Sequence, residues 1–534
     1  MIGIEGVAVD FFAPFDARRE AARVLRIRAA EIKHAGVLKR SLDCRRKPQI
    51  KAVYNLGVIV AGDESRIVRA CRNAKVRIIT PPAASLEEEL LRRCLPLGEA
   101  PLAGERPVVV GSGPAGLFCA LTLALLGARP RVIERGARVE ERVQKVNAFF
   151  NGADLDENCN VQFGEGGAGT FSDGKLSTGI GGGMAAAVVA EFARCGGGET
   201  LTAESKPHIG TDVLPRVVAA LRKKIEVLGG EFFFDTAVTD IKTSGGALRA
   251  LVLEGKHAGV LDCSRAVFAV GHSARDVYRT LFERGAEMTS KPFAVGVRIE
   301  HLQKDIDVAQ FGMSGGGLPA ADYKLTAQIN GRGCYTFCMC PGGEVVAAAS
   351  EAGGCVVNGM SASGRGGANA DSALIVTVTA ADFGRGVLDG VAFQRKWERL
   401  AYAAAGGYAP PVQRLDDFKS RRVSARFGGV QPSCRRGYAF ADLNSCLPAY
   451  VCEGISGAAD AFARKIPVFN RGDSLLSGVE TRTSAPVRIL RGADMQSSIR
   501  GLYPCGEGAG YAGGITSAAV DGVRVALSFI GAKI

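Results

Sequence analysis

The sequence predicts an α/β fold, made of a doubly wound domain, an antiparallel sheet inserted into it and a small α/β domain at the N-terminus. Its 534 residues, 47% hydrophobic and 22% charged, suffice for about three to four globular domains. Strand-like and helix-like segments alternate in the first half, whereas short strands between glycine pairs dominate after residue 292. The 70 glycines follow no period but gather at a few junctions, which is typical of backbone packed closely against a ligand.

The first domain is predicted to cover residues 1–100 in the order β-α-β-α-β. A helix from Asp16 to about His34 lies between strands at 7–12 and 49–60. The domain holds 19 Lys and Arg against 12 Asp and Glu, so it carries +7 of the chain's net charge of +12. A basic, solvated surface is the favoured explanation of this charge, and a surface that faces nucleic acid or another polyanion is the alternative. Prolines and glycines in 95–107 predict a linker.

The rest of the chain is predicted to form a split domain with an insertion. Its first part covers 104–290, the inserted antiparallel substrate domain covers 291–494, and the return segment covers 495–534. An amphipathic helix is expected at 211–228 and another helix at 391–405.

Cysteine usage and the N-terminus predict a cytoplasmic protein. The 15 cysteines are odd in number and irregularly spaced, and the N-terminal segment contains Glu5 without a basic region before it. The longest apolar run, 117–128, is shorter than the roughly 20 residues that span a membrane. No CxxC pairs are present among the clustered cysteines, so no metal site is expected.

The motif that carries most chemistry starts at a buried strand, Val108–Val110. Gly111-Ser-Gly113-Pro-Ala-Gly116 follows it, then an apolar helix, and Glu134 ends the next strand. In a Rossmann-type unit these glycines permit the tight turn, the approach of a pyrophosphate and close helix packing, and the acid binds a ribose. The motif therefore predicts a dinucleotide site; a chance glycine turn is the alternative.

A second glycine-rich junction at 501–514, GLYPCGEGAGYAGG, precedes the last helix. Two such junctions suit a cofactor longer than one nucleotide fold covers, which favours FAD, although a purely structural turn is the alternative. Glu507 is expected at a ribityl hydroxyl, and Lys175 in the loop 164–176 at a phosphate or the substrate. The residues predicted to bind the cofactor are Gly111, Gly113, Pro114, Ala115, Gly116, Glu134, Arg135, Gly167, Thr170, Lys175, Gly271, Gly506, Glu507, Gly514 and Ile515.

With these motifs, and an AVFAVG strand at 266–271, the chain resembles the glutathione-reductase-like FAD superfamily. It looks more closely like a family of uncharacterised FAD-dependent dehydrogenases of bacteria and plastids. The stretches that resemble this family are GSGPAGLFCA (111–120), VQFGEGGAGTFSDGKL (161–176), PHIGTD (207–212), GVRIEH (296–301), FCMCPGGEVV (337–346), NGMS (358–361), ETRTSAPVRI (480–489), YPCGEGAGYAGGI (503–515) and, in the small domain, KRSLDCRRK (39–47). A departure lies at 369–372, where Asp371 stands in place of a second Asn. The resemblance implies FAD but no substrate.

Five residues of the inserted domain are candidates for catalysis. Cys338 and Cys340 would share a strand face near the flavin, either as redox groups or as small buried side chains. Arg298 is expected to hold an anionic substrate group, and Glu300 and His301 to act as acid or base, with a surface ion pair as the alternative.

The function predicted is that of an FAD-dependent dehydrogenase or reductase, passing a hydride between the flavin and a small organic substrate. No second GxGxxG marks an NAD(P)H domain and no CxxxxC pair follows the first turn, so NAD(P)H is expected only as a transient electron donor. The alternative is a factor that binds or modifies nucleic acid through the basic domain, which is less favoured because 1–100 shows no stacking platform. A redox sensor is the third, weakest alternative.

Overall fold

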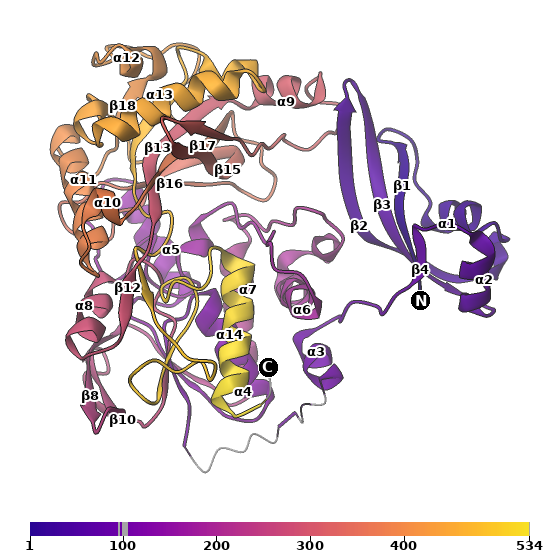
Figure 1. Cartoon of the computed structure of the whole chain (residues 1–534), viewed down its shortest axis with the longest axis horizontal. Coiled ribbons are helices and arrows are strands. Elements are labelled where there is room, and N and C mark those ends of the chain that lie inside the picture. The colour runs from indigo at the N-terminus through magenta and orange to yellow at the C-terminus, as the bar shows by residue number, and fades with distance from the viewer. Residues whose placement is uncertain (94, 96, 99–104, 533–534) are drawn as a thin grey trace.

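The computed structural model describes residues 1–93, 95, 97–98 and 105–532. Its three parts are seen side by side in Figure 1: an N-terminal sheet, a nucleotide-domain layer that carries the last helix, and an upper sheet covered by helices. The predicted linker at 95–107 lies partly outside the described residues. No helix among the described residues combines the length and the apolarity needed to cross a membrane.

The N-terminal domain is a four-stranded antiparallel sheet in the spatial order β2-β3-β1-β4. Its chain order βαββαβ is that of a ferredoxin-like unit. Its elements are β1 (Ile2–Asp10), α1 (Ala17–Leu25), β2 (Ile32–Arg46), β3 (Gln49–Val60), α2 (Glu64–Cys71) and β4 (Val76–Ile78). The helix predicted from Asp16 to His34 is too long, because Arg26 takes a left-handed conformation and ends α1. The missed strand β2 follows directly.

The long strand β2 joins this domain to the others. The backbone N–H of Arg40 donates to the carbonyl of Ala203, and the N–H of Ser205 donates to the carbonyl of Arg40. Near the other end of β2, the ammonium of Lys47 donates to the carbonyl of Ala309. Part of the basic charge of this domain therefore takes part in contacts within the chain.

The nucleotide domain is built on a five-stranded parallel sheet in the order β22-β11-β5-β6-β7. Its strands are β5 (Val108–Val110), β6 (Arg131–Ile133), β7 (Glu231–Phe233), β11 (Ala266–Phe268) and β22 (Leu502–Pro504). Its helices and flanking strands are α3 (Leu86–Arg92), α4 (Pro114–Leu125), α5 (Val139–Phe150), α6 (Gly183–Phe192), α7 (Leu214–Val227), β8 (Thr236–Ser244), β9 (Ala247–Gly255), β10 (Gly259–Asp262), α8 (Arg275–Glu283) and α14 (Ile515–Phe529). The expected Rossmann-type domain, split by an insertion, is confirmed.

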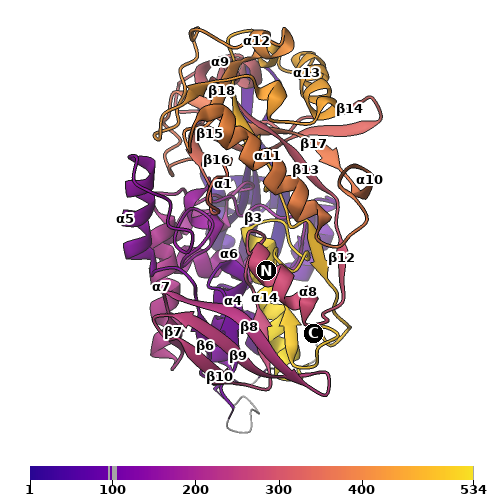
Figure 2. The same ribbon diagram turned by 90° about the vertical axis from the view of Figure 1, so that its left-hand side faces the viewer.

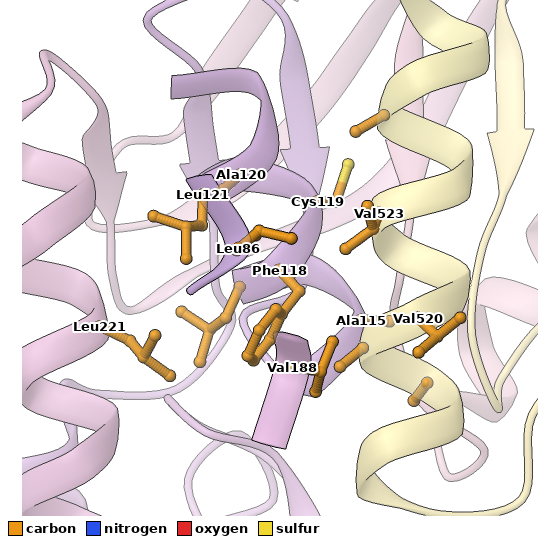
Figure 3. Close-up of a cluster of buried hydrophobic side chains, with 14 of the residues drawn as sticks. Leu86, Ala115, Phe118, Cys119, Ala120, Leu121, Val188, Leu221, Val520 and Val523 are labelled. Atoms are coloured by element: carbon orange, nitrogen blue, oxygen red, sulfur yellow. The ribbon is translucent and has the colours of Figure 1, made fainter. Parts of the chain in front are cut away.

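The core of this domain lies around α4, which is apolar on every side and buried from Ala115 to Leu125. Figure 3 shows Cys119 of α4 near Val523 of α14 and Ala115 of α4 near Val520 of α14. The two helices pack closely because Gly522 lies against the carbonyl of Ala115. The last helix thus completes the wall that the first glycine turn begins.

A substitution of Gly116 tests how closely α4 packs on the turn before it. A β-carbon there would overlap the carbonyl oxygen of Gly111, within the turn that precedes α4. We expect Gly116→Ala to destabilise the protein by about 1–3 kcal/mol, because the turn has to move. Chemical denaturation measures the loss. The matched control is Gly181→Ala, whose β-carbon would meet nothing within 4 Å and which should leave the midpoint unchanged.

The inserted domain is an eight-stranded sheet, largely antiparallel, as predicted. In the view of Figure 2, helices lie above the sheet and across its front. Its strands are β13 (Phe293–Leu302), β14 (Thr326–Ile329), β15 (Arg332–Ala347), β16 (Val357–Met360), β17 (Asn369–Val378), β18 (Pro411–Arg414), β19 (Ala439–Phe440) and β20 (Leu475–Glu480). Its helices are α9 (Gln303–Phe311), α10 (Ala380–Phe383), α11 (Asp389–Ala405), α12 (Leu415–Lys419) and α13 (Ala449–Ala463). Two short strands, β12 (Met288–Ser290) and β21 (Val487–Ile489), pair where the chain enters and leaves it.

A buried charge network ties α11 to the nucleotide domain. Glu398 accepts from Arg275 at 2.7 Å and from Arg482 at 2.9 Å, and Glu351 accepts from Arg275 at 3.0 Å and from Arg395 at 2.8 Å. Burial opposes ionisation of Glu351, but its arginine partners outweigh it and lower its pKa to about 2.

This network predicts a loss of stability in acid. A carboxyl whose pKa falls on folding, from 4.5 to about 2 for Glu351, stabilises the fold above pH 4.5, and this contribution is lost as the pH falls toward 2. We expect Glu351→Gln to flatten the dependence of unfolding free energy on pH between 4.5 and 2. Urea denaturation across this range measures it, with Glu283→Gln as an exposed control. An unchanged slope would mean that Glu351 is not ionised in the fold.

Candidate functional site

A cavity of about 340 Å³ lies where the glycine turns of the nucleotide domain meet the sheet of the inserted domain. Its floor is formed by the start of α4 and the start of α14, and its opposite wall carries residues from β15, β16 and β20. Of the predicted cofactor-binding residues, those that line it are Gly111, Gly113, Pro114, Ala115, Glu134, Arg135, Gly167, Lys175, Gly271, Glu507, Gly514 and Ile515.

Three of the residues predicted to bind the cofactor do not line this cavity and make structural contacts. Gly116 packs α4 on its turn, and Thr170 is buried beside Arg142. Gly506 donates its N–H to Asp521 of α14 at 2.7 Å. None of the three lines the cavity, and their contact with the cofactor stays a prediction.

Two helix N-termini point at the cavity without side-chain caps. Gly113 caps α4 and Gly514 caps α14, and neither offers a side chain to the free N–H groups. Positions 271, 513 and 514 are open, since a β-carbon on any of them would meet nothing within 4 Å. Free N–H groups and the positive ends of both helices suit the phosphates of a dinucleotide, and the open glycines leave room for a flat ring. The residues present therefore fit FAD.

Glu134 fastens three loops together at one end of the cavity. Its carboxylate accepts from the N–H and the hydroxyl of Ser112, both at 2.8 Å, and from the N–H groups of Gly136 and Gly164, both at 3.1 Å. Because these four donors come close to filling its acceptor sites, the carboxylate holds the glycine turn in shape. Its contact with a ribose stays a prediction.

At the other end, Glu507 and His272 face each other. The Nδ1 atom of His272 lies 3.5 Å from the Glu507 carboxylate, and its buried Nε2 atom has no protein partner. Burial, with Arg482 and Arg275 nearby, lowers the pKa of His272 to about 3, so the ring is neutral at pH 7. Burial raises the pKa of Glu507 to about 7. His272, which the sequence analysis missed, thus lines the cavity as a neutral ring with one unpartnered, buried nitrogen.

Cys338 projects from the opposite wall because of a β-bulge. In the pairing of β15 with β17, Phe337 faces Ala373 and Cys340 faces Asp371, so two residues stand opposite one. Cys338 takes φ +43°, which is uncommon for a residue with a side chain, and it lines the cavity. Cys340, also predicted to reach the flavin, has no exposed surface and does not line the cavity, which corrects that expectation.

Arg298 is not the predicted anchor for an anionic substrate. It is completely buried, and its guanidinium donates to Asp371, to Glu480 at 3.3 Å and to the carbonyl of Cys338 at 3.0 Å. These partners use its donors from inside the sheet. Asp371, whose place in the family pattern is a departure, is the closest of them.

Glu300 and His301 also lie away from the cavity, which corrects their expected role as acid and base. Glu300 accepts from Ser433 and Asn369, at 3.1 Å from the N–H of Ser433 and 2.8 Å from the Asn369 amide. The His301 ring is buried against Phe469 and bonds to its carbonyl at 3.1 Å. Side chains of this strand point into the packed layers on either side of the sheet. Their place in the sequence next to Arg298 therefore did not indicate a place in the cavity.

Comparisons with known proteins agree with FAD as the cofactor. The family model described as "FAD-dependent protein, C-terminal domain-like" matches residues 292–483, and a domain of unknown function matches residues 14–59. An uncharacterised protein of Clostridium beijerinckii is 44% identical over 515 residues, covering 95% of this chain and 94% of its own length. This chain belongs to the family of that clostridial protein. The matched family model makes this an FAD-dependent flavoprotein family, as the cavity's fit to FAD indicates.

Solved structures are only remotely similar. Glycine oxidase from Geobacillus kaustophilus is 14% identical, with 80% of this chain and 95% of that chain covered and a TM-score of 0.34. Glycerol-3-phosphate dehydrogenase from Bacillus halodurans, complexed with FAD, is 12% identical, with 84% and 69% covered and a TM-score of 0.34.

Proposed function

We propose that this flavoprotein is an oxidoreductase that transfers a hydride between FAD and a small organic substrate. The observation that carries the proposal is the single cavity whose floor is built from two cofactor-type helix starts and whose wall is lined by titratable groups of another domain. A substrate enclosed there would lie between that wall and the cofactor, as hydride transfer needs. When bound, FAD supplies the two-electron chemistry.

The protein's own residues bind the cofactor and orient the substrate beside it. The helix starts at Gly113 and Gly514 direct free N–H groups toward the anionic parts of the cofactor. Neutral His272 lines the cavity beside Glu507, whose pKa burial raises to about 7.

The charged residues that line the cavity favour a substrate whose binding needs no unpaired cation of the protein. Among the described lining residues each cation already has an acidic partner: Arg135 pairs with Asp276 at 2.7 Å, Lys175 with Asp173 at 3.0 Å and Arg482 with Glu398 at 2.9 Å. A neutral or zwitterionic polar compound therefore suits the wall better than a strongly anionic one.

The experiment is anaerobic reduction of the purified flavoprotein in a stopped-flow instrument. We propose NADH or NADPH as a transient donor and expect one of them to bleach the flavin absorbance, followed by reoxidation with one compound of a metabolite panel. Reduction by neither nucleotide, and by no compound of the panel, would overturn the proposal. Photoreduction of the same sample is the control that the bound flavin is competent.

A further inference from the structure

Cys338 and Glu480 stand on neighbouring parts of the same wall and are joined by one arginine. Both line the cavity, Cys338 from the bulge in β15 and Glu480 from the end of β20. Arg298 donates through one nitrogen to the Cys338 carbonyl and through another to the Glu480 carboxylate. The bulge is what turns the thiol from the sheet into the cavity, since regular pairing would leave it in the ladder.

The ion pairs behind this wall form a chain with a simple charge balance. Arg298 pairs with Asp371 and Glu480, while Lys175 and Arg365 both pair with Asp173, at 3.0 and 2.6 Å. Three cations thus face three carboxyl groups and the Cys338 thiol. If all four acids were ionised, the buried chain would carry an uncompensated negative charge, which burial penalises strongly. For the charges to balance, one of these four acidic groups therefore keeps its proton.

Two of the four acids face the cavity. Asp173 pairs with two cations, and Asp371 accepts from two nitrogens of Arg298. Glu480 meets the same guanidinium only at 3.3 Å, so the proton is assigned to Cys338 or Glu480. We propose that Cys338 and Glu480 share this proton, with Cys338 as the thiolate and Glu480 as the neutral acid, and so present a base and an acid to the substrate. This inference rests on the proposed function for its substrate.

The surroundings of Cys338 and Glu480 indicate which of the two groups holds the proton. Hydrogen bonding with Cys340 outweighs burial and, with Lys175 and Arg298, lowers the pKa of Cys338 well below that of an ordinary thiol. Burial raises the pKa of Glu480 to about 8 against the pull of Arg298. The titratable and charged groups that face Cys338 from the packed elements are Cys340, Lys175, Asp173, Arg298, Asp371, Glu480 and Glu507.

The pair fits a substrate oxidised at an X–H and a neighbouring C–H bond, where X is carbon, nitrogen or oxygen. Bound FAD would accept the hydride of the C–H bond, and the Cys338 sulfur would take the X–H proton and become a thiol. The X–H bonding pair forms the new double bond, so two electrons and two hydrogens leave the substrate. In the reverse direction Glu480 or the thiol returns the proton.

The first test follows alkylation of Cys338 by iodoacetamide in the holoprotein across pH, read by peptide mass spectrometry. An ordinary thiol reacts about tenfold faster per pH unit below its pKa of about 8.5. We expect the rate at Cys338 to be flat between pH 6.5 and 8, while the half-buried Cys44 rises steeply. Lys175→Met should move the Cys338 profile to higher pH, and the exposed Lys206→Met should not. A steep rise at Cys338 would overturn the proposal.

The second test detects the proton on Glu480 directly. Alkylation removes the thiolate charge, so the proton should leave Glu480 to restore the balance. We expect an infrared difference spectrum at pH 7.5 to show loss of a protonated carboxyl band on alkylation, and no loss in Glu480→Gln. Unchanged carboxyl bands would overturn proton sharing. Both tests read the protein without turnover. If they detect the shared proton while the stopped-flow experiment finds no hydride donor, only the proposed function is refuted.

Discussion

Arg298→Met will cost about 3–5 kcal/mol of stability at pH 7, the usual loss when one partner of a buried ion pair is removed. The substitution leaves Asp371 and Glu480 without their shared cation in a part of the sheet with almost no solvent exposure. Urea denaturation followed by far-UV circular dichroism measures the loss. The exposed Arg284, which pairs with Asp240, is the matched control, and Arg284→Met should leave the midpoint nearly unchanged.

The pH dependence of Arg298→Met separates charge from packing. Burial already raises the pKa of Asp371 to about 7, and removing its cation will raise it further. A carboxyl whose pKa is raised by folding stabilises the fold below its unfolded pKa, and the contribution is lost as the pH rises through the folded value. The variant should therefore regain stability from pH 7 to pH 5. If it does not, the arginine acts only by filling space. Combining Arg298→Met with Asp371→Leu should restore part of the loss at pH 7.

Glu134→Ala will release FAD, with at least a tenfold loss of affinity. The carboxylate is the acceptor for Ser112, Gly136 and Gly164, and each buried N–H left unpaired costs about 1–3 kcal/mol. The turn at Ser112 will loosen, and the start of α4 will no longer hold its direction. Titration of the apoprotein with FAD, followed by flavin fluorescence, measures the affinity.

Glu134→Gln distinguishes the loop-fastening role from a ribose contact. The amide keeps one acceptor oxygen but turns two donors toward N–H groups, so an intermediate loss is expected. Glu226→Ala, on the exposed side of α7, is the control that should bind FAD normally. Wild-type affinity in Glu134→Ala would show that neither role matters.

The nucleotide domain was predictable because its determinants are local. The strand, glycine turn, helix and acid from Val108 to Glu134 follow one another within 27 residues, and each residue acts on its neighbours. The same holds for α7 and α11, whose apolar periodicity is visible in sequence. The missed strand β2 has no such signal, since its burial pattern is mostly intermediate along both faces.

The cavity wall that the inserted domain contributes was less predictable because its geometry is long-range. A bulge that opposes two residues of β15 to one of β17 decides which cysteine reaches the cavity, and no spacing in the sequence encodes it. Arg298 looked like a substrate anchor because Asp371 and Glu480 lie 73 and 182 residues away. His272 was overlooked because its significance is an unpartnered nitrogen, which only packing reveals.

The pairing of α4 with α14 has a consequence for how this protein is made in the cell. About 390 residues separate the end of α4 from the start of α14, and about 400 separate Gly113 from Gly514. At about 5–20 residues per second, a ribosome needs roughly 20–80 s to bridge them. Throughout that interval the nascent chain displays the wholly apolar helix α4 without its partner and lacks half of the cofactor cradle. Loading of FAD therefore waits until translation reaches α14, and chaperones that shield apolar helices have their main task before then.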